Sequence, residues 1–180
     1  MSIVENLVRA YENALNEPWV GTLSGQERVW FLVYDPAEQR KIDLRMGEFE
    51  TATMKAGKKW IEVSLKPCFP EWMSNHDYKE EYFADPEALV DQLETEFKQH
   101  AIDFLAGKMK DGEVDENTVV AVRDVSALFG FVRLSEVLHG ASSTFRGRML
   151  VFFPGEFQKN QYRLLDARDG WSYLARPITS

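Results

Sequence analysis

The nine residues RVWFLVYDP, at positions 28 to 36, decide the fold class of this chain. The apolar run VWFLVY is typical of a β-strand that is covered on both faces. Directly after it, Asp35 has the side chain of a helix N-cap, Pro36 suits a first helical turn, and Glu38 completes the spacing of a capping box. The pattern predicts a strand followed at once by a helix, which we expect to run to about Ala56.

The following segments extend this unit into an α/β pattern. KWIEVSL, at 59 to 65, predicts a second strand, so a right-handed crossover should join two parallel strands. TVVAVRD, at 118 to 124, and GRMLVFFPG, at 147 to 155, predict two more buried strands. We therefore predict a three-layer α/β fold, with a mainly parallel sheet and helices on both faces.

The remaining segments fit one domain spanning residues 1–180, with an N-terminal helix of residues 1–16 packed on it. Helical periodicity marks residues 3 to 15, 85 to 107 and 125 to 140, the last with a possible break near Gly130. Residues 66 to 84 are rich in proline and aromatic residues, and we expect them to be irregular. Residues 162 to 178 predict one or two short strands around the turn DARDG.

The composition is that of an ordinary folded protein. Of the 180 residues, 44% are hydrophobic, and a chain of this length buries roughly two-thirds of its unfolded surface. The single cysteine, Cys68, excludes an internal disulfide and suits a reducing compartment. No segment has the pattern of a signal peptide or of a membrane span of about 20 apolar residues, so we expect a cytoplasmic protein.

The formal net charge of −8 argues against general DNA binding, which depends on basic groups that neutralise phosphates. We do not expect the chain to bind nucleic acid by itself. A local basic patch in the last third of the chain is nevertheless an alternative, because arginines gather there: Arg133, Arg146, Arg148, Arg163, Arg168 and Arg176.

The end of the fourth strand has the position at which many α/β proteins hold phosphate. Its apolar run stops at Pro154 and Gly155, and the acid Glu156 follows. A phosphate loop, GxxxxGK[ST], needs a lysine and a hydroxyl that do not stand in their places here, and no GxGxxG occurs. We therefore predict a sheet like that of P-loop proteins without the Walker A loop, no cofactor, and a plain turn at Pro154-Gly155.

Residue patterns for metal binding and nucleophilic catalysis are equally sparse. The histidines His76, His100 and His139 do not have the spacing of helical metal ligands, so no metal site is predicted. Cys68 is expected to be a small buried hydrophobe rather than a nucleophile. We expect no catalytic residues and a protein that is not an enzyme.

Aromatic and arginine side chains gather near the C-terminus, and these residue types carry many protein–protein contacts. Alternation along a short strand places Trp171 and Tyr173 on one face. If that face is exposed it forms a docking patch, and the alternative is a packing role for either ring. The predicted partner-binding residues are Phe157, Arg163, Arg168, Trp171, Tyr173 and Arg176.

A second set of candidates lies near the predicted strand ends. Open α/β sheets bind ligands in a crevice outside the C-terminal ends of their strands. The polar residues expected near these ends are Asp35, Asp124, Arg133 and Glu156. They are the candidates for a nucleotide or small-ligand site.

Three C-terminal segments together resemble the BrxB family of BREX phage-defence systems. They are VVAVRDVSALFGFVRLSEVLHG, RMLVFFPGEF and YRLLDARDGWSYLARPI, and they span about residues 118 to 178. A proline is more usual near Gly130 in that family. The resemblance implies a small bacterial protein encoded beside a phosphatase-fold PglZ protein, a BrxC-type ATPase and a PglX-type DNA methyltransferase. It supplies no catalytic motif to transfer.

The leading hypothesis is a non-catalytic adaptor of a BREX-type defence complex. The resemblance implies a PglZ-like protein as its first partner and a BrxC-like ATPase as the second. One alternative is a nucleotide- or small-ligand-binding protein or enzyme with a site at the strand ends. The other is a nucleic-acid-binding accessory subunit that uses the arginines of the last third.

Overall fold

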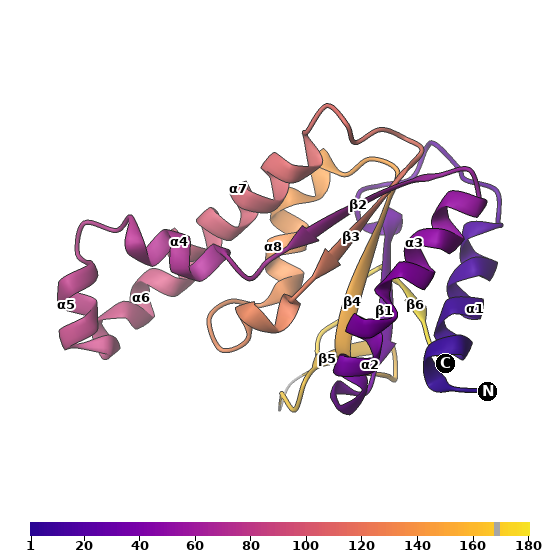
Figure 1. Ribbon diagram of the computed structural model, residues 1–180. Helices are drawn as coiled ribbons and strands as arrows, with labels where there is room; N and C mark the ends of the chain where they lie inside the picture. Colours follow the sequence, from indigo (N-terminus) through magenta and orange to yellow (C-terminus); the bar gives the residue numbers. More distant parts are fainter. Residues whose placement is uncertain (168–169) are drawn as a thin grey trace.

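The computed structural model describes residues 1–167 and 170–180, and it confirms the predicted α/β fold (Figure 1). Five parallel strands lie in the order β2-β3-β4-β1-β6, and β5 pairs with β4 in the antiparallel direction. The strands are β1 (Val29–Tyr34), β2 (Lys59–Ser64), β3 (Thr118–Arg123), β4 (Arg148–Gln158), β5 (Gln161–Leu164) and β6 (Arg176–Ile178). The first four strands lie where the apolar runs predict them.

Helices cover both faces of the sheet, as predicted (Figure 1). One face packs against α1 (Ile3–Leu15), α2 (Gln39–Leu44) and α3 (Met46–Lys55), and the other against α4 (Cys68–Ser74), α7 (Lys98–Met109) and α8 (Leu134–Ala141). Alternate residues of β1 face opposite cores: Phe31 belongs to the α7–α8 side and Leu32 to the α1–α3 side. All six residues of β1 are buried, which explains its continuous apolar run.

The N-terminal helix α1 forms as predicted and packs on the sheet. Ser2 and Glu5 form a reciprocal capping box at its start. The hydroxyls of Tyr11 and Thr53 lie 2.6 Å apart in a buried hydrogen bond, which ties α1 to α3.

The single helix predicted from Pro36 to Ala56 is wrong, because the segment is divided. A 3-10 turn, η2 (Pro36–Glu38), precedes α2, and Arg45 separates α2 from α3. The Arg45 backbone leaves the helical region (φ −111°, ψ 18°). Its guanidinium donates to Ser2 Oγ at 3.0 Å and to the Glu48 carboxylate. The break therefore coincides with a contact to the start of α1.

The irregular segment predicted over residues 66 to 84 is also wrong, because it contains α4 and α5 (Lys79–Ala84). Pro67 stands at the N-cap of α4 and Pro70 in its first turn, where a backbone N–H has no helical acceptor. The prolines therefore begin a helix here instead of preventing one.

The helix predicted over residues 85 to 107 is a series of shorter pieces. They are η3 (Pro86–Leu89), α6 (Val90–Gln92), the π-helical turn η4 (Leu93–Phe97) and α7, which continues past Gly107 to Met109. Within the described residues, no helix is both long enough and apolar enough to cross a membrane.

The turn predicted at Pro154-Gly155 is wrong, because β4 runs through both residues. β4 pairs with β1 as far as Pro154, which stands opposite Tyr34, and from Gly155 onward it pairs with β5. A Cβ on Gly155 would lie 2.0 Å from the Arg163 carbonyl oxygen, so only glycine fits this exchange of partners. The turn of the hairpin is instead at Lys159-Asn160, where both residues have positive φ.

The C-terminal segment contains two short strands, β5 and β6, where one or two are predicted around DARDG, whose Arg168 and Asp169 lie outside the described residues. β5 precedes this stretch, and Trp171 directly after it pairs with Tyr162 in an isolated antiparallel bridge. The chain then adds β6 to the edge of the main sheet, parallel to β1. This return carries Trp171 and Tyr173 across the α7–α8 side of the sheet.

Candidate functional site

A hollow of about 620 Å³ lies where the loop after β3 meets the start of α7 and the C-terminal segment. It is of the size that accepts small ligands or anchoring side chains. Glu94, Thr95 and Lys98 form one wall, and Leu164, Ala167 and Trp171 form another. The residues of the loop and of the start of α8 complete it: Phe129, Gly130, Phe131, Val132, Arg133, Leu134 and Glu136.

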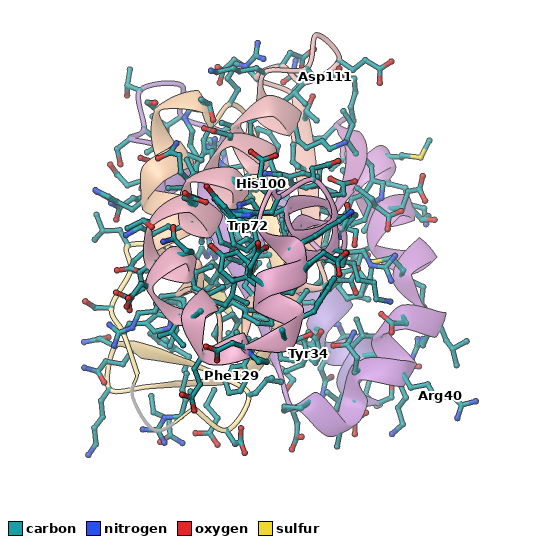
Figure 2. The ribbon with its side chains drawn as sticks, turned by 90° about the vertical axis from the view of Figure 1, so that its left-hand side faces the viewer. Tyr34, Arg40, Trp72, His100, Asp111 and Phe129 are labelled. Atoms are coloured by element: carbon teal, nitrogen blue, oxygen red, sulfur yellow. The ribbon has the colours of Figure 1, made fainter. Side chains whose placement is uncertain are left out.

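The loop is held in place by buried residues on both sides of its tip. Val125 and Leu128 are buried in the preceding 3-10 turn η5 (Val125–Leu128). Phe131 stacks on Phe69, with ring centroids 4.3 Å apart. Between these anchors Phe129 is 40% exposed. Figure 2 shows it at the same end of the molecule as Tyr34, the last residue of β1, and opposite to Asp111. The loop therefore presents an aromatic ring at the end where the strands finish.

A second hollow of about 430 Å³ continues the first along α7 and α8. The two share Lys98 and Glu136, and the second is also lined by His139 and Tyr173. We call the two hollows together the C-terminal groove. Two acids and two bases line its wall beside aromatic rings. The charged residues are Glu94, Glu136, Lys98 and Arg133. This arrangement suits an amphipathic partner that carries charges of both signs.

Trp171 and Tyr173 lie on one side of the C-terminal segment, but that side faces inward. Both rings have their centroids 5.8 Å from that of Phe31, Trp171 edge-on and Tyr173 stacked. Each is half-buried and also lines one of the two hollows. The two rings are therefore part of the core and of the groove wall together.

The other predicted partner-binding residues do not join this surface. Phe157 packs on Tyr162, with ring centroids 4.6 Å apart, and Arg163 is opposite Glu156 across the β4–β5 hairpin. Arg176 donates two hydrogen bonds to the Glu17 carboxylate, at 2.5 and 2.9 Å, on the α1 side. Arg168 lies outside the described residues.

The four crevice candidates are distributed over separate places. Only Arg133 lines the C-terminal groove. The Asp35 carboxylate accepts from the Ala37 N–H at 2.9 Å as a helix cap, and Asp124 accepts from Ser64 Oγ at 2.5 Å. Glu156 lines a small hollow of about 140 Å³ beside the β4–β5 hairpin. The structure therefore does not bring these four residues around one cavity.

A polar network at the strand ends was missed by sequence reasoning. The Tyr34 hydroxyl donates to Gln39 Oε1 at 2.5 Å, and Gln39 Nε2 donates to Asp43 at 3.0 Å. Arg123 joins Asp43 (3.1 Å) to Glu62 (3.0 Å) across β2 and β3. Burial, followed by the Asp43 charge, raises the pKa of Tyr34. The available signal was a polar group at the end of an apolar run, which Tyr34 and Arg123 both provide.

Two buried arginines lie at the other end of the sheet: Arg28, which sequence reasoning missed, and Arg148, which belongs to the alternative basic patch. Arg28 donates to Glu116 (2.9 Å) and to the Gly147 carbonyl (3.3 Å). Arg148 donates to the same carbonyl at 2.8 Å and lies 4.8 Å from the Trp19 ring centroid. Burial, and then the charge of Arg28, lowers the pKa of Arg148. Arg148 is thus enclosed by protein and is not part of an exposed basic surface.

Comparison of the chain with protein-family models, with curated proteins and with solved structures finds no match in any of the three. In the part of the chain that the structure describes, no group of three or more His, Cys, Asp or Glu side chains could hold one metal ion. The groove and the distribution of charge are therefore the features of the molecule that bear on its function.

Proposed function

We propose that the protein is an adaptor that binds another protein subunit in the C-terminal groove. The observation that carries the proposal is the meeting of Phe129, Arg133 and Trp171 around one hollow. Aromatic residues and arginine are the residue types that dominate protein–protein binding energy when a partner excludes water from them.

The groove is rigid on its inner side, which favours binding. The Trp171 ring packs edge-on against Phe31 and Phe153, with centroids 5.8 and 5.7 Å away, and its backbone pairs with Tyr162. A side chain that is already ordered loses little entropy when a partner binds. The exposed ring of Phe129 adds apolar surface that only a bound partner would cover.

The resemblance to the BrxB family supports a particular partner. We propose a PglZ-like protein as the first candidate and a BrxC-like ATPase as the second, which would make the chain a non-catalytic subunit of a BREX-type anti-phage complex. The mixed charges of Lys98, Arg133, Glu94 and Glu136 suit a protein segment, because both signs of charge find partners there.

The test is co-purification with the PglZ-like protein from the same gene neighbourhood, followed by calorimetry of the pair. Phe129→Ala and Arg133→Glu should each weaken binding by about tenfold or more, as the loss of a central contact does. The matched controls are Leu44→Ala, which removes a side chain that is 78% exposed on α2, and Arg40→Glu. Figure 2 shows Arg40 well away from Phe129.

The controls should bind as the unchanged protein does, and all four variants should keep its unfolding temperature. Equal binding by Phe129→Ala, Arg133→Glu and the controls would place the partner elsewhere and refute the groove. If neither candidate protein forms a complex, the proposed partners are wrong.

A small anionic ligand is the second candidate occupant, favoured by the volume of the first hollow and by Lys98 and Arg133 in its wall. Calorimetry with ATP, GTP and a dinucleotide, with and without magnesium, tests it. Saturable binding that Arg133→Glu removes would support a ligand site. No heat at about 1 mM ligand would exclude these compounds, because that limit lies beyond ordinary ligand affinities.

A further inference from the structure

The helical segment of residues 77 to 96 carries nearly all of the net charge of the protein. It holds eight acidic residues and one lysine, a net charge of −7 against −8 for the whole chain. The acids are Asp77, Glu80, Glu81, Asp85, Glu87, Asp91, Glu94 and Glu96, and all are exposed. Figure 1 shows the helices of this segment, α5 and α6, projecting from the body on the far side of α4 and α7. We call residues 77 to 96 the acidic lobe.

The acidic lobe also exposes large apolar side chains. Tyr78, Phe83 and Val90 are 61%, 65% and 59% exposed. In contrast, Tyr82, Leu89 and Leu93 of the same lobe are partly buried against the α7–α8 core. The lobe therefore has an inner apolar side that holds it to the body and further apolar side chains turned to solvent. Three large apolar side chains exposed within one projecting segment favour an interaction surface there.

The carboxylates of the acidic lobe are not neutralised by the protein itself. In the part of the chain that the structure describes, Glu96 is the one acid of the lobe with a basic partner, His76 at 2.8 Å. The lobe's own lysine, Lys79, donates to the Ser74 carbonyl at 3.4 Å, and among residues 1–167 and 170–180 no carboxylate lies within 4 Å of its ammonium group. Eight acids within 20 residues repel one another wherever their separation is below the Debye length, which is about 8 Å in physiological salt.

We propose that the acidic lobe is a docking surface for a basic amphipathic segment of another protein. Lysine or arginine side chains of such a segment would neutralise the lobe carboxylates, and its apolar residues would cover Phe83, Tyr78 and Val90. A nucleic acid or an anionic membrane carries the same sign of charge as the lobe and would be repelled. The acidic lobe is a different surface from the C-terminal groove, because the two have only Glu94 and Thr95 in common.

Fluorescence polarisation with a designed peptide tests the proposal on the full chain. The probe is a labelled helix-forming peptide of about 15 residues, with lysines on one face and leucines on the other. One control peptide has serines in place of the leucines, and another has glutamates in place of the lysines. We expect saturable binding of the first peptide, binding about tenfold weaker for the serine peptide, and none for the glutamate peptide.

Matched variants separate the lobe from general charge attraction. The triple variant Glu80→Gln, Glu81→Gln, Glu87→Gln should weaken peptide binding by about tenfold or more. The control triple variant Glu12→Gln, Glu50→Gln, Glu113→Gln removes the same three charges at exposed positions outside the lobe and should change binding less than about twofold. Phe83→Ser should weaken binding as the lobe triple variant does. Met54→Ser, which alters a side chain that is 63% exposed on α3, should not.

Three outcomes would overturn the proposal. The first is the absence of saturable binding at about 1 mM peptide. The second is equal weakening by both triple variants, which would mean that net charge alone attracts the peptide. The third is a dimer in sedimentation analysis that Phe83→Ser dissociates, because a second copy of this chain would then be the occupant. Phe129→Ala should leave peptide binding unchanged, so the lobe and the groove are tested separately.

Discussion

Two tyrosines beside Phe31, the buried Tyr162 and the half-buried Tyr173, differ in what their hydroxyls meet. The Tyr162 hydroxyl donates to the Ala175 carbonyl at 2.6 Å. The Tyr173 hydroxyl is equally shielded, but it has no hydrogen-bond partner within residues 1–167 and 170–180. Burial raises the pKa of both phenols. A buried polar group is costly when it is unpaired, whereas a hydrogen bond offsets that cost and adds a modest net stability.

Removing each hydroxyl should therefore change the free energy of unfolding differently. Tyr162→Phe should lower the free energy of unfolding by about 1–2 kcal/mol, because the Ala175 carbonyl loses its donor, whereas Tyr173→Phe should leave it within about 0.5 kcal/mol or raise it. Urea unfolding monitored by tryptophan fluorescence measures both, and each variant is the control for the other. An equal loss in both variants would show that the Tyr173 hydroxyl is paired in solution.

The sequence predicts which side chains share a face better than it predicts where that face points. Alternation placed Trp171 and Tyr173 together, and both rings do contact Phe31. Exposure could not be predicted, because it depends on the return of the chain to β1 through β6, a pairing with no local signal. The exposure of Phe129 could not be predicted either, because an aromatic residue beside a glycine fits a turn in the core as well as one on the surface.

At the scale of elements, the buried strands were the most predictable part of the fold. A strand covered on both faces must be apolar throughout, so β1, β3 and most of β4 follow from composition alone. The divided helices were not predictable, because the break at Arg45 accompanies a contact with Ser2 that is distant in sequence. The helix α4 is not evident from the sequence, because proline breaks a helix in its interior but is compatible with its N-cap and first turn, where Pro67 and Pro70 stand.

The continuation of β4 past Pro154 depends on the absence of a side chain at Gly155. In Gly155→Ala the new methyl group would meet the Arg163 carbonyl oxygen of β5, and we expect a loss of about 1–3 kcal/mol in the free energy of unfolding. Gly107→Ala is the matched control, since apart from the neighbouring turns of α7 no atom of the described residues lies within 4 Å of its added Cβ. It should raise stability by up to about 1 kcal/mol. Gly155→Ala with unchanged stability would mean that the hairpin accommodates the methyl group by shifting.

At the scale of the whole molecule, charge and apolar surface are arranged unevenly. The 20 residues of the acidic lobe hold a net charge of −7, so the other 160 residues are almost neutral at −1. Net charge read from the composition does not reveal this division, because it says nothing of which residues project from the body. The groove and the lobe lie next to each other, and they offer a partner two surfaces of different chemistry.

The core as a whole should make the protein sensitive to alkaline conditions. Burial raises the pKa of the Cys68 thiol from its ordinary 9.0 to about 12, and burial also raises the pKa of four tyrosines, Tyr11, Tyr34, Tyr162 and Tyr173. The folded state therefore keeps protons that the unfolded chain releases. This stabilisation is complete below about pH 9 and is lost as the pH rises toward 12.

The contribution of Cys68 to this loss can be isolated. At about pH 10, one unit above the ordinary pKa of the thiol, Cys68 is ionised in the unfolded chain but not in the folded protein. This difference alone should lower the free energy of unfolding by about 1.4 kcal/mol. Urea unfolding at about pH 8 and pH 10 measures the loss in the unchanged protein and in Cys68→Ala. The variant is less stable at both values because of the cavity it leaves, so the informative quantity is the difference between them. The loss of unfolding free energy between about pH 8 and pH 10 should be about 1.4 kcal/mol smaller in Cys68→Ala than in the unchanged protein. The loss that remains in the variant is due to the tyrosines. The same difference in both proteins would mean that Cys68 ionises in the folded state as readily as in the unfolded chain, and that its pocket is open to water.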